Sequence, residues 1–292
     1  MILVTGATGQ YGSKAIEHLL KKGVDPSEIS ALVRDEKKAS ILKELGIKIK
    51  VGDYTDHYSL LRAFENVDTL LLVSSNDRSA VENRTKQHIS AIKAASKTRV
   101  GHIVYTSFAR KPDYRDSILS EFQDSHVQTE GFLKESGIDY TILQNGIYME
   151  MIPPFVGEKV VETGAIVFPA KKGCASWVLR EELAEAAAHV LTTEGHKNKT
   201  YTLTNPEAKG FEEIASEMTT VLGKKITYES PDTDRFGSML KNAGVPDMLI
   251  GMLSLWAGAV AQNRLDLRDD TLQSFLGRKP KNLSSFIKKT YG

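Results

Sequence analysis

Residues 1–12 read Met-Ile-Leu-Val-Thr-Gly-Ala-Thr-Gly-Gln-Tyr-Gly, and this stretch decides the fold. The apolar run Met1–Val4 predicts a strand, and the amphipathic run after the glycines predicts a helix. Gly6 allows a sharp turn, Gly9 lets phosphate oxygens approach the backbone, and Gly12 lets the helix pack close to the strand. The stretch therefore predicts a site for a dinucleotide pyrophosphate at the positive end of that helix.

Outward from this motif, short apolar runs alternate with amphipathic ones through the first half of the chain. We expect strands at Ile2–Thr5, Ile29–Val33, Ile47–Val51, Thr69–Ser74, His102–Ser107 and Tyr140–Leu143. We expect helices at Tyr11–Lys22, Lys37–Leu45, Ser59–Phe64, Arg84–Ser96 and Ser120–Glu135. Strands that alternate with helices predict an α/β Rossmann fold, with a doubly wound parallel sheet.

The alternation stops near Met151, where two prolines interrupt it. Beyond that point we expect strands at 164–168 and 201–204, and helices at 180–192, 210–222, 232–243, 246–258 and 283–289. We therefore expect an NAD(P)-binding Rossmann domain over residues 1–150 and a smaller, mostly helical substrate-binding lobe over residues 151–292. Some segments after residue 150 can also rejoin the sheet of the Rossmann domain. Ligands of open parallel sheets bind beyond the carboxyl ends of the strands, so the lobe is expected to form one wall of a cleft.

Charge and composition narrow the class of protein. The 292 residues carry 38 basic and 37 acidic side chains, so no basic surface for nucleic acid or for an anionic membrane is expected. The apolar runs are too short to span a bilayer, and the first residues enter a strand without the features of a signal peptide. The single cysteine, Cys174, cannot form an internal disulfide and is interpreted as an inert small residue. These features predict a cytoplasmic protein.

Polar residues at the end of the second expected strand bear on the choice between NADP(H) and NAD(H). Arg34 follows the strand directly, and its planar guanidinium suits the 2′-phosphate of NADP(H). Asp35 is interpreted as the N-cap of the next helix rather than as a ligand of the ribose. NADPH is therefore the expected cofactor, although NAD(H) remains possible. The alternative for Arg34 is an ordinary solvated surface charge.

The other strands also end in polar residues at the edge where a dinucleotide would lie. The residues expected to contact the cofactor are Gly6, Ala7, Thr8, Gly9, Gln10, Tyr11, Gly12, Arg34, Asp53, Tyr54, Ser74, Ser75, Asn76, Thr106, Leu143 and Asn145. Asp53 could accept from the adenine amino group and Tyr54 could flank the base. The alternative for this pair is a capping aspartate and a packing tyrosine. Their shared place at strand ends is what favours a binding role.

The catalytic pair of many single-domain reductases is missing. In that pair a lysine four residues after a tyrosine lowers the pKa of the phenol, and none of the ten tyrosines here has one. No metal site is expected from the scattered histidines. The candidate catalytic residues are His126, Asn145 and Tyr148. His126 and Glu130 share a helix face, where they form either a proton donor for the pocket or a local polar pair.

Several segments together resemble the NmrA-like group of atypical short-chain dehydrogenases, and within it the bacterial quinone oxidoreductases of type 2 and the triphenylmethane dye reductases. The segments are residues 5–12, Val33-Arg34, Gly52-Asp53-Tyr54, Tyr105-Thr-Ser, residues 140–146, Arg180-Glu-Glu-Leu-Ala-Glu-Ala-Ala-Ala, residues 194–201 and Asn242-Ala-Gly-Val-Pro. The resemblance implies NADPH bound by Gly6–Gly12 and by Arg34. The isoflavone-reductase branch has a lysine near the position of His126, so its type of carbonyl or ether reduction is not expected here.

Two functions remain open. The first is an NADPH-dependent oxidoreductase that transfers a hydride to a quinone or a similar conjugated, electron-poor acceptor, by positioning and exclusion of water. The second is a non-catalytic, NAD(P)-binding redox sensor of the NmrA type. The missing tyrosine–lysine pair is consistent with this function as well. A monomer and a homodimer are both consistent with the sequence.

Overall fold

The computed structural model describes residues 1–75 and 81–292, and their contacts divide the chain into two compact units. Unit 1 comprises Met1–Phe108, Glu121–Asn145 and Arg180–Leu203, and unit 2 comprises Ala109–Ser120, Gly146–Leu179 and Thr204–Gly292. Each unit is therefore discontinuous in sequence, whereas the sequence analysis expected one boundary at residue 150. The segment Arg180–Leu203 returns from the second half of the chain to the sheet.

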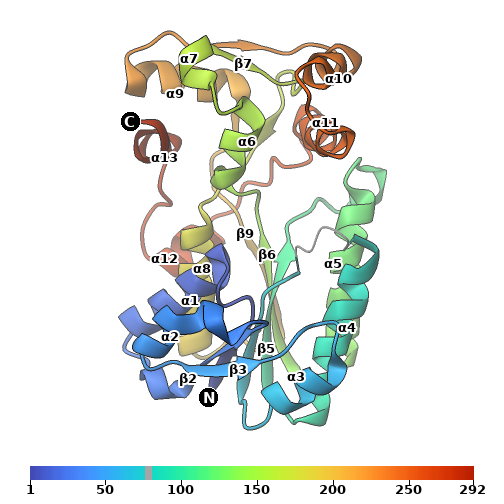
Figure 1. Cartoon of the computed structure of the whole chain (residues 1–292), viewed down its shortest axis with the longest axis vertical. Coiled ribbons are helices and arrows are strands. Elements are labelled where there is room, and N and C mark those ends of the chain that lie inside the picture. Colours follow the sequence, from blue (N-terminus) through green and yellow to red (C-terminus); the bar gives the residue numbers. More distant parts are fainter. Residues whose placement is uncertain (76–80) are drawn as a thin grey trace. The chain divides into compact units, whose positions relative to one another are not determined.

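Unit 1 is a Rossmann-type sandwich (Figure 1). Its elements are β1 (Ile2–Val4), α1 (Gln10–Lys21), β2 (Ile29–Val33), α2 (Ser40–Glu44), β3 (Lys48–Val51), α3 (His57–Ala63), β4 (Thr69–Leu72), α4 (Val81–Lys97), β5 (His102–Phe108), α5 (Ser120–Glu135), β6 (Asp139–Asn145), α8 (Arg180–Thr192) and β9 (Lys199–Leu203). Within the described residues they form a seven-stranded sheet in the order β3-β2-β1-β4-β5-β6-β9. All of its pairings are parallel. The predicted fold class is confirmed.

Strand alternation divides the buried side chains between the two faces of the sheet. On one face Leu3, Leu70 and Ile103 pack with apolar residues of α3, α4 and α5. On the other face α1 and α8 lie against each other, and the Tyr11 hydroxyl donates to the carbonyl of Leu183 at 3.0 Å. Continuous apolar strands of this kind are expected of a parallel sheet covered on both sides.

The last crossover of the sheet has an unusual hand. The connections from β4 to β5 and from β5 to β6 carry α4 and α5 on one face, and the step from β6 to β9 continues in the same direction along the sheet. Its helix α8 lies on the opposite face, beside α1. This crossover is therefore opposite in hand to the two before it, although such connections nearly always share one hand.

Several predicted boundaries are wrong. Strand β4 ends at Leu72 and not at Ser74, because the next backbone N–H groups bind side chains instead of the ladder. The helix expected over 37–45 is a 3-10 turn, Glu36–Ala39, followed by α2. Asp35 caps that turn by accepting from the N–H of Lys37, as expected of a helix cap.

Unit 2 is mostly helical, with two small two-stranded sheets that the sequence analysis missed in part. Its elements are 3-10 turns at Tyr114–Asp116 and Met149–Met151, α6 (Ile152–Val156), α7 (Val160–Thr163), β7 (Ala165–Val167), β8 (Cys174–Ala175), β10 (Lys209–Gly210), α9 (Phe211–Leu222), β11 (Thr227–Glu229), α10 (Thr233–Asn242), α11 (Asp247–Ala261), α12 (Thr271–Leu276) and α13 (Leu283–Tyr291). Its core is aromatic: the ring of Phe168 lies 5.0 Å from that of Phe155 and 4.7 Å from that of Phe211.

Candidate functional site

The glycine turn between β1 and α1 has the geometry that the sequence predicts. Gly6 has a φ of +57°, a conformation that favours glycine, and its carbonyl accepts from the N–H of Gly9 at 2.9 Å. A Cβ on Gly12 would lie only 2.4 Å from the Gly6 oxygen. Any other residue at position 12 would therefore force the first turn of α1 away from the glycine turn. None of the residues in the first turn of α1, all of which are described, is acidic. The exposed turn therefore lies at the positive end of a helix with no carboxylate in its first turn, which is a favourable place for an anion.

Three residues beside this turn have roles that the sequence left unspecified. The Tyr11 side chain is buried and binds α8, so only its backbone remains for a cofactor. The amide oxygen of Gln10 accepts from the Arg180 guanidinium at 2.5 Å. Arg180, which the sequence analysis treated only as the start of a helix, thus brings a cation to the positive end of α1.

The residues at the ends of β2 and β3 lie near one another. Arg34 is exposed and forms no ion pair within the described part of the chain. Burial of Asp53 opposes its ionisation, but hydrogen bonds from the side chain and N–H of Thr55, together with the charge of Arg34, outweigh it and lower the pKa of Asp53. Asp53 therefore closes a local turn. That observation favours the capping role, while an adenine contact stays a prediction.

Tyr54 is tied into the sheet. Its hydroxyl lies 2.6 Å from Thr5 Oγ1 and 2.9 Å from the carbonyl oxygen of Val73, and burial raises the pKa of this phenol. The hydroxyl thus joins the ends of β1 and β4. A contact between the Tyr54 ring and a cofactor base remains a prediction.

The backbone beyond β4 is held by side chains from three different elements. The N–H of Val73 donates to Thr5 Oγ1 at 2.8 Å, and that of Ser74 donates to Thr106 Oγ1 at 2.8 Å. The N–H of Ser75 donates to His88 Nε2 at 2.9 Å. Asn76, which was also expected to contact the cofactor, lies outside the described residues.

The face covered by α4 and α5 contains a buried polar cluster. The Tyr105 hydroxyl lies 2.8 Å from His126 Nδ1, and His126 Nε2 lies 3.1 Å from an Arg84 nitrogen. The Arg84 guanidinium also stacks over the Phe122 ring at 4.7 Å. Because a guanidinium only donates, His126 must accept at Nε2 and be neutral while this bond is in place. In this arrangement His126 orders the interior and is not poised as a proton donor.

Glu130, which the sequence places on one helix face with His126, binds residues of the sheet. Ser107 Oγ donates to Glu130 Oε1 at 2.5 Å, and the Gln144 amide lies 3.3 Å from the same oxygen. All three residues belong to unit 1, and Glu130 is buried. His126 and Glu130 therefore connect α5 to different residues of β5, and Glu130 also contacts β6.

Asn145 is the most unusual of the expected site residues. It ends β6, its side chain is 0 % exposed, and neither Oδ1 nor Nδ2 has a hydrogen-bond partner among the described residues. Buried polar groups are nearly always paired, so an unpaired amide calls for a specific reason.

Two other expected site residues lie in different units. Leu143 is fully buried within β6, where its side chain packs in the core. Tyr148 belongs to unit 2, where it pairs with Val178.

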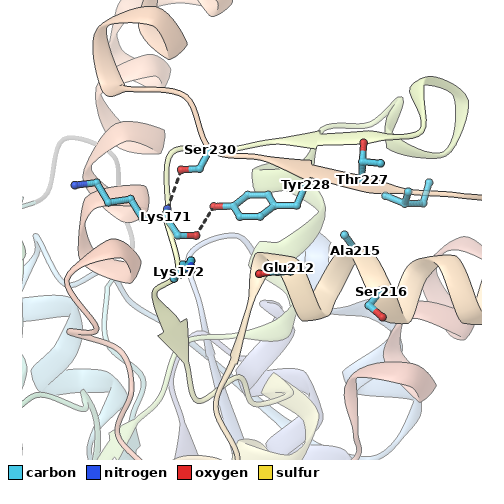
Figure 2. Close-up of a pocket in the computed structure, with 9 residues that line it drawn as sticks. Lys171, Lys172, Glu212, Ala215, Ser216, Thr227, Tyr228 and Ser230 are labelled. Atoms are coloured by element: carbon cyan, nitrogen blue, oxygen red, sulfur yellow. Dashed lines mark hydrogen bonds between the residues drawn. The ribbon is translucent and has the colours of Figure 1, made fainter.

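Unit 2 contains a pocket of about 660 Å³ that the sequence analysis did not anticipate. Figure 2 shows the Tyr228 hydroxyl directed at the carbonyl of Lys171, at 3.0 Å, and the N–H of Lys171 donating to Ser230 Oγ at 2.8 Å. The wall opposite is formed by Glu212 and its neighbours on α9. The Tyr228 and Ser230 hydroxyls are thus engaged in holding the residue-171 turn.

Comparison with known proteins agrees with this architecture. The family model described as "NmrA-like family" matches residues 1–287. The chain belongs to the NmrA-like family. Quinone oxidoreductase 2 of Escherichia coli strain K12 is 36% identical over 289 residues, which cover 98% of this chain and 97% of that protein. NAD(P)H azoreductase of Xenophilus azovorans is 27% identical, over 99% and 97% of the two chains.

Solved structures of similar proteins superpose over nearly the full length of the chain. Triphenylmethane reductase of Citrobacter sp., complexed with NADP(H), has a TM-score of 0.92 and 37% identity, with 99% of each chain covered. The Escherichia coli quinone oxidoreductase QOR2, complexed with NADPH, has a TM-score of 0.91 and 34% identity, with 100% of each chain covered. Within residues 1–75 and 81–292, no helix combines the length and apolar character that crossing a membrane requires.

Proposed function

We propose that this protein is an NADPH-dependent oxidoreductase that reduces a quinone or a similar conjugated, electron-poor acceptor. The observation that carries the proposal is the glycine turn, where a Cβ on Gly12 would lie 2.4 Å from the Gly6 oxygen at the start of a helix with no acidic first turn. This turn stands in a full-length member of the NmrA-like family. The similar proteins named above are reductases of quinones, azo compounds and triphenylmethane dyes.

The residues at the carboxyl edge of the sheet fit this cofactor. The turn Gly6–Gly12 would hold the pyrophosphate through backbone N–H groups, and Arg180 lies beside it. Arg34 would bind the 2′-phosphate that distinguishes NADPH from NADH. The unpaired amide of Asn145 carries N–H donors and a carbonyl acceptor, which complement those of the nicotinamide carboxamide.

Bound NADPH supplies the hydride, and the protein supplies position and a dry environment. A quinone takes up one hydride and one proton, and the hydroquinone anion can take that proton from solvent as it leaves the site. Such acceptors are electrophilic enough to need no strong acid, which is consistent with the missing tyrosine–lysine pair and with the internal role of His126. Tyr148 and Asn145 are proposed to contact the acceptor and the nicotinamide.

The test is a steady-state assay. We expect purified protein to oxidise NADPH, followed by loss of its absorbance, when a benzoquinone or a cationic triphenylmethane dye is added, and not without an acceptor. Tight NADPH binding with no turnover on any quinone or dye would favour the redox sensor instead. Calorimetric titrations that give no saturable binding of either coenzyme would rule out both functions.

Two finer predictions remain open to measurement. The sequence predicts a cytoplasmic protein that is a monomer or a homodimer. Light scattering of the purified protein would determine the oligomeric state, and fractionation of cells would determine the location.

A further inference from the structure

The segment Val73–Ser75 leaves the sheet in a defined conformation. Its three N–H groups no longer bind a neighbouring strand. Each is bound instead by one side chain: Thr5 directly after β1, Thr106 from β5 and His88 from α4. A Cβ placed on Gly6 would lie 3.5 Å from the Val73 side chain, so this segment flanks the glycine turn. Its position therefore helps to shape the edge of the sheet where the pyrophosphate is proposed to bind.

His88 can hold Ser75 only as one tautomer of the neutral ring. Its side chain is 0 % exposed, and Nε2 must carry the lone pair because it accepts from the Ser75 N–H. The proton therefore lies on Nδ1, which is 3.0 Å from Thr129 Oγ1 and 3.3 Å from the Tyr105 hydroxyl. Thr129 in turn donates to the Ser125 carbonyl at 2.8 Å, so its oxygen is available to accept from His88.

The surroundings keep this ring neutral. Burial, together with the charge of Arg84, lowers the pKa of His88 to about 3. The second imidazole, His126, is oriented in the same cluster, because Arg84 donates to its Nε2 and its Nδ1 proton faces the Tyr105 hydroxyl. The histidine that binds Ser75 is thus fixed in position and in tautomer from both α4 and α5.

We propose that His88 is a positioning residue for the cofactor, which acts by fixing the Ser75 backbone beside the glycine turn through its Nε2 lone pair. This inference rests on the proposed function, since the ligand so positioned is NADPH. His88 does not touch the reacting atoms. It acts through the peptide that it binds, and small displacements of such a peptide are sufficient to weaken binding and hydride transfer.

Two substitutions at His88 distinguish a role in positioning the Ser75 backbone from a general role in protein stability. His88→Gln places an amide oxygen near the position of Nε2 and can still accept from Ser75, whereas His88→Asn reaches only the position of Nδ1. We expect the NADPH dissociation constant of His88→Asn to rise about tenfold, the effect of one buried donor left unpaired. His88→Gln should retain most of the affinity. His88→Asn should also lose more thermal stability than His88→Gln, because it leaves the Ser75 N–H unpaired and removes one more methylene from a buried site.

The control is His102→Asn. His102 is the first residue of β5, so it lies at the amino ends of the strands, away from the glycine turn at their carboxyl ends. Its Nε2 lies 2.9 Å from the hydroxyl of a threonine, Thr141. This variant should lose stability without a change in the dissociation constant for NADPH. In steady state, His88→Asn should raise the KM for NADPH and leave the KM for the quinone unchanged, whereas simple unfolding would lower kcat alone.

A second readout needs no cofactor. Hydrogen exchange of the peptide that contains Ser75 should accelerate in His88→Asn and not in His88→Gln. The inference is overturned if the parent binds NADPH and both variants bind it equally well, or if both lose affinity together. A parent protein that does not bind NADPH would instead overturn the proposed function, and this inference with it.

Discussion

Replacement of Asn145 by leucine should make the free protein more stable and the cofactor bind less tightly. The side chain is 0 % exposed and both of its polar atoms lack partners among the described residues, so the folded protein bears the cost of an unsatisfied amide. Each unsatisfied buried group costs about 1–3 kcal/mol. Leucine has the same branching, removes both groups, and is better suited to a strand.

The magnitude follows from these opposing effects. Removal of the two unpaired polar atoms should raise the free energy of unfolding by at least about 2 kcal/mol. The larger methyl groups overpack the site and offset about 1 kcal/mol of this gain. A net gain of about 1 kcal/mol corresponds to a rise in Tm of about 2–4 °C for a protein of this size. Because the amide is proposed to bind the nicotinamide carboxamide, loss of that contact should weaken NADPH binding about tenfold.

Thermal unfolding of the free protein and calorimetric titration with NADPH measure the two effects. The matched control is Thr141→Val on the same strand. The Thr141 hydroxyl is equally buried but is paired with the His196 carbonyl at 2.8 Å, so its removal should lower Tm. If Asn145→Leu lowers Tm as much as Thr141→Val does and leaves the NADPH affinity unchanged, the amide is satisfied within the native protein and the reasoning is refuted.

Three other outcomes are expected. Arg34→Glu should weaken NADPH binding about tenfold to a hundredfold and NADH binding little, because only NADPH carries the 2′-phosphate; equal losses in titrations with the two coenzymes would contradict this role. Gly12→Ala should lower Tm and abolish NADPH binding, since its Cβ would lie 2.4 Å from the Gly6 oxygen, whereas Gly131→Ala, in a helix with open space around it, should be neutral or stabilising. Thermal stability should fall as the pH drops from about 6.5 towards 3: the folded protein lowers the pKa of His88 to about 3, so the unfolded chain binds more protons in this range. Melting curves that do not change across that interval would refute the assignment of a neutral His88.

The sequence predicts the features that depend on local geometry. Gly6, Gly9 and Gly12 require particular backbone angles and close contacts, and these requirements can be read without knowing the rest of the fold. Asp35 caps the turn that follows it, because an aspartate can bind the N–H group two residues later.

Other features could not be predicted, because local patterns do not report distant partners. The shared helix face of His126 and Glu130 gives no sign that one is bound to Tyr105 and Arg84 and the other to Ser107. The end of β4 was predicted two residues too late, because the apolar pattern gives no sign that side chains from other elements take over the hydrogen bonds of the backbone.

The sequence by itself thus determined the alternation of strands and helices, the glycine turn and the set of polar residues at strand ends, since each depends on neighbours within a few residues. Only the tertiary structure decided that α8 packs beside α1, that His88 binds Ser75, and that Asn145 is left unpaired. The physical reason is that these contacts depend on how each helix is rotated and placed over the sheet. That placement is set by the packing of the whole core and not by the periodicity of any one segment.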